Sequence, residues 1–344
     1  MADETLPLVW PPAWKAGMKI GILSTSSPTI YDFSQRAERG RKNLEAVLSG
    51  QANEISKRLR TSGFVVEKPE IIAEHIHEMF LDKQVGLIVA AVGGFNTNSV
   101  LPYIDWDLLR AHPTYVCGYS DTSALLDAIN ARARIGTLHG PALLPQWGDM
   151  HGPFEETINS FYSSIASPDR TNILKYAGFW CDPRTDWNAV DPVQTFHGKQ
   201  RFNEPWRVLR PGTAQGRLIG GNIETVNMLL GTPYCPSFDQ KILFLEATGA
   251  EAYLPRFQRA LTHLQCAGVF SRIRGLIVGR CPDAKPVAGT SLDEILLELL
   301  ADSHFPVMVD VDLGHTEPMI TLPIGANAVV VAEPGDVSIV LKMR

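Results

Sequence analysis

The sequence predicts an α/β protein with an N-terminal parallel-sheet domain and a smaller C-terminal α/β domain that has its own sheet. Short apolar runs alternate with helical patterns up to residue 136, as in parallel sheets covered by helices. A second alternation follows residue 212, and residues 150–215 between them are rich in Pro, Asp, Arg and Trp with little periodicity. We therefore expect domains at 1–165 and 213–344, joined by a connecting segment at 166–212 that is a candidate cover for a site.

The N-terminal elements follow from apolar runs and turn residues. Residues 18–28 predict a buried strand that runs into a polar turn, and residues 86–94 form a continuous apolar run that ends in paired glycines. The other predicted elements are a helix at 36–63 that ends at Gly63, strands at 64–69 and 114–120, and a helix at 121–136 closed by Gly136.

The C-terminal half has the same kinds of pattern. Its helical patterns lie at 253–270 and 291–302, and its apolar runs lie within 216–234, 241–247, 273–280 and 307–332. In open parallel sheets, ligands bind at the carboxyl ends of strands. The segments "VGGFN" and "GYSD", at 92–96 and 118–121, fall at such ends and are candidate site segments.

Composition excludes several classes of protein. The formal net charge is −6 and no basic block stands out, so we expect no nucleic-acid polymer as a partner. The five cysteines are scattered without a CxxC pair, which predicts reduced thiols in a cytoplasmic protein with neither disulfides nor zinc. We see no signal-peptide pattern and no apolar run long enough to span a bilayer, so no membrane association is expected.

Ser120, in "YVCGYSDTSALL", ends a predicted strand and directly precedes a predicted helix. A nucleophilic serine needs such a turn, a base for its proton and backbone N–H donors for the oxyanion. Gly118 permits a tight turn, and the N-terminus of the helix favours developing negative charge. The alternative is that Ser120 or Asp121 only caps that helix. Because Thr122 replaces the second glycine of GxSxG, this stretch alone favours the cap.

Histidines supply the candidate bases. His315 lies on a loop after a predicted strand, where catalytic groups are often placed. His139 is a second candidate, with a hydrogen-bonded core residue as the alternative, and His263 is interpreted as structural within a helix. His75 and His77 would lie on different faces of a helix and HExxH is absent, so no metal site is expected.

Glu246 ends the apolar run "KILFLE" and is the candidate acid. A carboxylate at the end of a buried strand needs a partner, because an unpaired buried charge is costly. The alternative is a glutamate exposed at the end of the strand. The order Ser120, Glu246, His315 places the acid before the histidine, which is one of the known orders for a serine triad.

Six segments together resemble the LD-carboxypeptidase family of serine peptidases, and more narrowly its microcin C immunity branch: "GGFNTNSVLPYID", "GYSDTSALL", "HGPAL", "GRLIGGNIETVNMLLGTPY", "ILFLEA" and "DLGHTEPMITLPIG". The resemblance covers nearly the whole chain. It implies a Rossmann/flavodoxin-like first domain with a nucleophile elbow, followed by a second domain that carries the acid and the histidine. It also implies Ser120 as nucleophile, Glu246 as acid, His315 as base, and an oxyanion hole formed by the N–H groups of Gly94 and Asp121.

The resemblance implies hydrolysis of a small peptide-like amide. The immunity branch cuts the amide between an aminoacyl or peptidyl part and a modified nucleotide, whereas murein members remove D-alanine from an L,D-linked tetrapeptide. The loop "GGFNTN" differs from the "GGYG" type of murein members and favours the immunity-like branch. Ala247 departs from that branch, which commonly has an acidic residue after the glutamate.

Other residues are candidates for substrate binding: Gly93, Phe95, Asn96, Trp180, Trp187 and Asn222. The resemblance places an aromatic residue against adenine, and Trp180 is the nearer match. The alternative is that both tryptophans pack within a proline-rich linker. Arg184 either contacts phosphate or carboxylate or is an exposed loop arginine, and Asn222 either lines the pocket or caps a helix.

Two other classes of protein fit the sequence less well. A non-catalytic peptide- or nucleotide-binding protein has no need of all three triad residues, and a metal amidase needs clustered His and carboxylate ligands that the sequence lacks. We therefore expect a serine hydrolase that needs no cofactor or metal and acts on a small peptide or peptidyl-nucleotide. By the resemblance, we also expect a homodimer.

Overall fold

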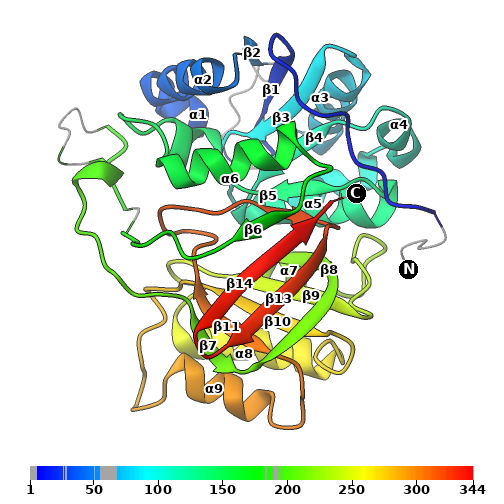
Figure 1. The fold of residues 1–344 in the computed structure, drawn as a ribbon. Helices are drawn as coiled ribbons and strands as arrows, with labels where there is room; N and C mark the ends of the chain where they lie inside the picture. Colours follow the sequence, from blue (N-terminus) through cyan, green and yellow to red (C-terminus); the bar gives the residue numbers. More distant parts are fainter. Residues whose placement is uncertain are drawn as a thin grey trace.

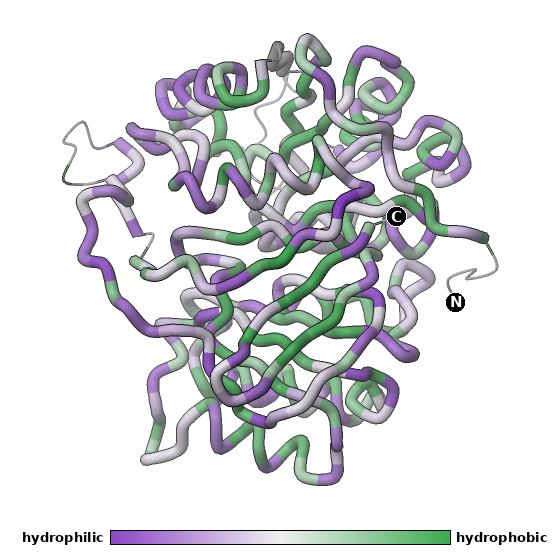
Figure 2. The backbone as a smooth tube through the Cα atoms, in the orientation of Figure 1, coloured by the Kyte–Doolittle hydropathy of each residue, from purple (hydrophilic) through white to green (hydrophobic). Residues whose placement is uncertain are grey.

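The computed structural model describes residues 6–25, 27, 29–49, 51–54, 68–182, 184–188, 193 and 195–343. These residues form two sheets with their helices, the N-terminal one in the upper part of Figure 1 and the C-terminal one below it. The predicted α/β fold class is confirmed. Apolar residues concentrate in the strands of both sheets (Figure 2). None of the described helices is long and apolar enough to cross a bilayer.

The first sheet has six strands in the order β12-β5-β4-β3-β1-β2. Its strands are β1 (Lys19–Leu23), β2 (Gln51–Glu54), β3 (Val85–Ala90), β4 (Tyr115–Gly118), β5 (Thr137–His139) and β12 (Leu322–Ile324). Strands β1 to β5 are parallel, and β12 is antiparallel to β5. The parallel arrangement brings the carboxyl ends of β3 and β4 to the same edge of the sheet.

Helices of this half cover the first sheet (Figure 1). They are α1 (Thr29–Asp32), α2 (Ser34–Leu48), α3 (Pro69–Leu81), α4 (Trp106–Ala111), α5 (Ser123–Ala128) and α6 (Glu155–Ala166). Short 3₁₀ or π segments are η1 (Thr97–Tyr103), η2 (Ser120–Thr122), η3 (Ile129–Ala133), η4 (Leu143–Trp147) and η6 (Phe196–Gly198).

The predicted helix at 36–63 is wrong. Helix α2 ends at Leu48, because Ser49 adopts the left-handed conformation with φ 49° and breaks the hydrogen-bond ladder. Residues 51–54 then form β2, which pairs with β1. Residues 55–67, including Gly63 and most of the predicted strand at 64–69, lie outside the described residues, and Pro69 starts α3.

The predicted helix at 121–136 is shorter and less regular than expected. It consists of η2, α5 and η3, and it is closed by Arg134 in the left-handed conformation with φ 56°, not by Gly136. Glycine is required at position 136 for a different reason. A Cβ atom there would lie 2.3 Å from the ring of Trp10, so the close approach of that indole requires glycine.

The second sheet has eight strands in the order β6-β14-β13-β8-β9-β10-β11-β7. Its central strands β8, β9, β10 and β11 are parallel. The strands are β6 (Asn172–Leu174), β7 (Arg207–Arg210), β8 (Gly212–Asn222), β9 (Lys241–Glu246), β10 (Gly275–Gly279), β11 (Val307–Val311), β13 (Asn327–Glu333) and β14 (Asp336–Lys342). The helices are α7 (Ile223–Leu229), α8 (Leu254–Cys266) and α9 (Leu292–Leu299).

The two sheets exchange strands across the predicted domain boundaries. Strand β12, from the C-terminal part of the chain, pairs with β5 in the first sheet, and β6 and β7, from the connecting segment, join the second sheet. One apolar cluster also contains buried residues of both sheets, among them Val116, Phe244 and Met308. The carboxyl ends of β4 and β9 are therefore held in a fixed relation by a common core.

Candidate active site

Ser120 lies two residues after the end of β4 and starts η2. Its φ is 60°, a left-handed conformation that is uncommon for a residue other than glycine and that is often found at functional sites. The cap residues of η2 and α5 are Tyr119 and Thr122, and neither makes a side-chain cap hydrogen bond. The structure therefore shows Ser120 on a strained strand-to-helix turn rather than as a helix cap.

The glycine loop after β3 touches this serine. A Cβ atom built on Gly93 would lie 2.7 Å from both Cβ and Oγ of Ser120 and 3.3 Å from the backbone nitrogen of Asp121. Only glycine allows this approach. The backbone of the loop thus faces both the serine hydroxyl and the backbone nitrogen that follows it.

The Asp121 side chain fixes the same loop. Its Oδ2 accepts hydrogen bonds from the backbone nitrogen of Thr97 at 2.9 Å and from Thr97 Oγ1 at 2.6 Å. Thr25 Oγ1 lies 2.6 Å from Thr97 Oγ1 and extends the network. Asp121 therefore ties the turn that carries Ser120 to the start of η1.

Glu246 and His315 form a hydrogen-bonded pair. Nδ1 of His315 donates to Oε2 of Glu246 at 2.6 Å. Glu246 is the last residue of β9 and is fully buried, which excludes the alternative of an exposed carboxylate. Gly314 has φ 82°, and a Cβ atom on it would lie 2.7 Å from Cβ of Glu246. Glycine is therefore needed just before the histidine for the two side chains to meet.

The pKa shifts of this pair have opposing causes. Burial acts to raise the pKa of Glu246, but the charge of His315 and the hydrogen bond to it outweigh burial and hold that pKa below its ordinary value. Burial acts to lower the pKa of His315, and Glu246 outweighs it, so the histidine pKa is raised. The arrangement strengthens His315 as a proton acceptor.

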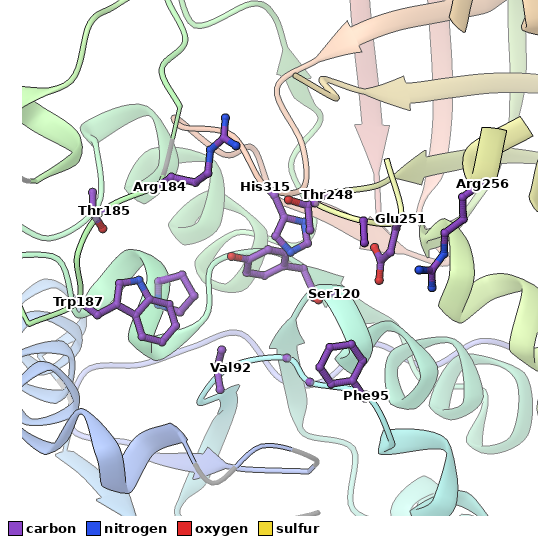
Figure 3. A pocket seen from close by; sticks show the side chains of 16 residues that line it. Val92, Phe95, Ser120, Arg184, Thr185, Trp187, Thr248, Glu251, Arg256 and His315 are labelled. Carbon is purple, nitrogen blue, oxygen red and sulfur yellow. The ribbon is translucent and has the colours of Figure 1, made fainter. Parts of the chain in front are cut away.

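Ser120 and His315 line one pocket of about 590 Å³, and the buried Glu246 is linked to it through its hydrogen bond to His315. Figure 3 shows the imidazole of His315 beside Ser120, with Trp187 and Arg184 on one side and Glu251 and Arg256 on the other. The described side chains form no hydrogen bond between Ser120 and His315, and such bonds often tighten only when substrate binds. The lining residues are Val92, Gly93, Gly94, Phe95, Tyr119, Ser120, Pro145, Arg184, Thr185, Trp187, Thr248, Gly249, Ala250, Glu251, Arg256 and His315.

The two tryptophans have different surroundings. Trp187 lines the pocket, where Phe33 packs edge-on at 5.2 Å between ring centroids and the guanidinium of Arg36 lies 5.2 Å from its ring. Trp180 stacks on Phe202 at 4.8 Å, and its Nε1 donates to Glu204 at 2.9 Å. Trp180 is absent from the described lining residues, so the structure places Trp187, and not Trp180, at the pocket.

Asn222 is the N-cap of α7. Its Oδ1 accepts hydrogen bonds from the backbone nitrogens of Glu224 and Thr225. Its Nδ2 donates to Oε2 of Glu251 at 2.5 Å, and its backbone is paired in register with Glu246. Asn222 thus lies behind the lining residue Glu251, and neither Asn222 nor Asn96 is among the described lining residues.

The other histidines considered are not among the described lining residues, although His139 packs edge-on against the lining residue Tyr119 at 6.2 Å between ring centroids. His139 is fully buried beside Phe244, and burial lowers its pKa to about 4, so the ring is neutral at pH 7. His77 accepts a hydrogen bond from the backbone nitrogen of Asp105, and His263 bonds to Asn227. Within the described ranges, no group of three His, Cys, Asp or Glu residues is placed to hold a metal ion.

Sequence reasoning missed the loop at 248–251 and the residue that fixes it. Asp283 Oδ2 accepts a hydrogen bond from the Gly249 backbone nitrogen at 2.9 Å, and Oδ1 accepts from Nη1 of Arg184 at 3.0 Å. Asp283 thereby joins two pocket-lining segments. The loop has no periodic pattern, and its only signal in the sequence is its position directly after Glu246.

Comparisons with known proteins identify relatives over the full fold. Models of the LD-carboxypeptidase N-terminal and C-terminal domains match residues 20–140 and 215–330. A Vibrio cholerae protein named as a carboxypeptidase is 32% identical, over 94% of this chain and 95% of its own length. Microcin C7 self-immunity protein MccF of Escherichia coli is 29% identical, over 98% and 97%. A Bacillus subtilis protein named as a murein peptide carboxypeptidase is 26% identical, over 92% and 90%.

Solved structures of microcin C7 self-immunity protein MccF have the same fold. Three of them give a TM-score of 0.89 at 25% identity and cover 98% of this chain and 99% of theirs. One is in complex with aspartyl sulfamoyl adenosine. Another is an active site mutant in which a serine, an asparagine and a lysine are replaced by alanine. The third is a tryptophan-to-phenylalanine mutant in complex with adenosine monophosphate.

Proposed function

The chain belongs to the LD-carboxypeptidase family of serine peptidases, and from this premise we propose that it hydrolyses a small peptide-like amide through a serine acyl-enzyme. The family identified from the sequence motifs is the one that the comparisons find. In our proposal Ser120 is the nucleophile, His315 the base and Glu246 the acid that orients it. The observation that carries the proposal is the convergence of Ser120, the His315–Glu246 pair and the Gly93 loop at one pocket.

The chemical steps follow from these positions. His315 takes the proton of the Ser120 hydroxyl as Oγ attacks the amide carbonyl, and the backbone N–H groups of Gly94 and Asp121 receive the oxyanion. His315 then gives that proton to the leaving nitrogen as the C–N bond breaks. Water, deprotonated by His315, attacks the ester and frees Ser120. Glu246 stabilises the imidazolium that forms in both half-reactions.

For the substrate we propose an aminoacyl amide of a nucleotide-like group. The pocket lining includes three aromatic side chains, Phe95, Tyr119 and Trp187. An aromatic platform stabilises a stacked base by about 1–3 kcal/mol. The related MccF is known in complex with aspartyl sulfamoyl adenosine and, as a tryptophan mutant, with adenosine monophosphate. These ligands support a nucleotide-like substrate for this chain.

A murein tetrapeptide is the second candidate substrate. It is supported by the Bacillus subtilis relative, which is 26% identical over 92% of this chain. A lysine is among the residues replaced in the active site mutant of MccF. The described lining residues here include no lysine, and their cationic side chains besides His315 are Arg184 and Arg256. This difference allows the substrate of this chain to differ from that of MccF. The expected homodimer and cytoplasmic location stay predictions.

The test is hydrolysis of two substrates by purified protein. Aspartyl sulfamoyl adenosine and an L,D-linked murein tetrapeptide are compared, with product release followed by chromatography. We expect cleavage of the nucleotide conjugate, with kcat about 10⁴–10⁶-fold lower in Ser120→Ala, because the variant retains only binding and the oxyanion donors.

The control variant is Ser271→Ala, whose exposed hydroxyl bonds only to the Gly268 carbonyl among the described groups. It should match the wild type. Undiminished hydrolysis by Ser120→Ala would refute the acyl-enzyme mechanism. Cleavage of the murein peptide alone would assign the protein to the second substrate class.

A further inference from the structure

The charged side chains of the pocket are unequally paired. Besides His315, the described lining residues include three charged groups, Arg184, Arg256 and Glu251. Arg184 pairs with Asp182 and with Asp283 at 3.0 Å. Both carboxylates lie beside one guanidinium, so the charge around Arg184 is net negative.

Arg256 is also neutralised. Its Nε and Nη2 donate to the two carboxylate oxygens of Glu224, the second at 2.6 Å. A bidentate pair of this kind leaves little charge to attract a second anion. Neither arginine of the pocket therefore offers an uncompensated positive charge to a substrate carboxylate.

Glu251 differs from both arginines. Its partner is the neutral amide of Asn222, which donates to Oε2 at 2.5 Å. The charges of His315 and Arg256 act on it at longer range, but no cation among the described residues forms an ion pair with it. Burial, with Glu246 adding to it, raises the pKa of Glu251, which shows that the site disfavours a second negative charge. A cation placed beside Glu251 would relieve this.

Glu251 also lies close to the reacting groups. Asn222 bonds to Glu251 through its side chain and is paired in register with Glu246, which bonds to His315. Figure 3 shows Glu251 on the pocket wall next to Thr248, with its carboxylate on the side of Ser120 and His315. A substrate group held by Glu251 must therefore lie near the carbonyl that Ser120 attacks.

We propose that Glu251 binds the free α-ammonium group of the substrate, so that the pocket selects aminoacyl amides over their N-acylated forms. In an α-aminoacyl amide, the ammonium nitrogen is two bonds from the scissile carbonyl carbon, which matches the position of Glu251 beside the dyad. An N-acylated substrate has no ammonium group and leaves the Glu251 carboxylate without a cation. A substrate carboxylate placed beside Glu251 would be repelled by its like charge. This proposal rests on the proposed hydrolytic function and names its substrate class.

The test pairs one variant with two substrates. Aspartyl sulfamoyl adenosine and its N-acetyl derivative are hydrolysed by the wild type and by Glu251→Gln, which keeps an oxygen acceptor for Asn222 but removes the charge. We expect the wild type to prefer the free amine by about 10–100-fold in kcat/KM, the range for a buried charged pair. In Glu251→Gln, the ratio of kcat/KM for the free amine to that for the N-acetyl derivative should fall toward one. Most of this change should be a higher KM for the free amine.

The matched control is Glu298→Gln, an exposed glutamate on α9, which should keep the wild-type ratio. Equal ratios in the wild type and Glu251→Gln would overturn the proposal. If the wild type cleaves neither compound, the proposed hydrolysis of nucleotide conjugates fails, and calorimetric binding of the same pair of compounds still decides the role of Glu251. Tighter binding of the free amine that Glu251→Gln abolishes would support it, and equal binding would refute it.

Discussion

The floor and the roof of the pocket are built in different ways. The floor is defined as Gly93, Ser120, Glu246 and His315, which lie at the end of a strand or a few residues after one, in two sheets that share a core. The roof, defined as residues 184–188 and 248–251, is tied through Asp283, and the side chain of Arg184 in that tie is 67% exposed. Exposed ion pairs contribute only about 0–1 kcal/mol each.

This contrast separates two functions of the fold. The proposed reacting groups depend on packing that tolerates little change, whereas the segments that line the rest of the pocket are held by weak and exchangeable contacts. Substitutions in the floor should therefore abolish chemistry, and substitutions in the roof should change which substrate is accepted.

Gly93→Ala should have the largest effect among the variants that keep all three reacting side chains. The new Cβ would lie 2.7 Å from Cβ and Oγ of Ser120, too close to be tolerated without movement of the serine or of the glycine loop. Misplacement of a reacting atom by about 1 Å slows a reaction on the order of 100-fold. We expect kcat to fall by about 100- to 1,000-fold, measured with the better of the two substrates.

The thermal unfolding midpoint of Gly93→Ala shows whether the loss is local. A midpoint near that of the wild type with a large fall in kcat would support a rigid floor. Activity within about threefold of the wild type would show that the loop moves freely, and the proposed contrast with the roof would then be lost.

The floor was the part of the site that sequence reasoning could predict. Ser120, Glu246 and His315 each follow an apolar run, and parallel strands bring such ends together. The acid–histidine contact itself depends on Gly314, whose requirement for glycine is visible only in three dimensions. The pairing of β12 with the first sheet was not predictable for the same reason, since that strand has three residues and a distant partner.

The roof was not predictable in detail. Trp180 and Trp187 lie in the same irregular segment with no periodicity, and the sequence contains no signal for which of them faces the pocket. The helix expected at 36–63 failed for a local reason, because a left-handed serine ends it within a helical pattern. Both cases show that isolated backbone conformations and long-range contacts override local propensity.

A buried carboxyl under the floor should make stability depend on pH. Glu317 is fully buried, accepts a hydrogen bond from Nε2 of Gln146 at 2.8 Å, and has its pKa raised by burial to about 8. The same Gln146 nitrogen donates to the hydroxyl of Tyr119, whose ring packs edge-on against His315. In the folded protein, Glu317 is therefore protonated at pH values below about 8.

The sign follows from this raised pKa. The folded state binds the Glu317 proton more tightly than the unfolded state, so its stabilising effect is complete below the ordinary glutamate pKa and is lost as the pH rises through about 8. In the wild type, we expect Glu317 to lower the free energy of unfolding by about 2 kcal/mol as the pH rises from about 6 to 8. Glu317→Gln should lack this decrease, because its side chain does not titrate. Urea unfolding of both proteins at these pH values measures it, and parallel curves for the two would contradict the assignment.

Asp283→Asn should have the smallest effect, confined to the roof. The amide keeps one oxygen acceptor but removes the charge that holds Arg184, at a contact exposed enough to be screened by water. We expect the KM for the preferred substrate to rise about two- to fivefold, while the turnover rate and the unfolding midpoint stay close to those of the wild type.

Asp239→Asn is the matched control, because Asp239 pairs with Arg272 at 2.6 Å on an exposed surface whose residues do not line the pocket. It should change neither the KM nor the turnover rate. A rise in KM only for Asp283→Asn would show that the roof positions substrate through a weak but specific contact. If turnover by Asp283→Asn instead slowed by about 100-fold at constant KM, Asp283 would support the reacting groups, and the division between floor and roof would have to be redrawn at the loop 248–251.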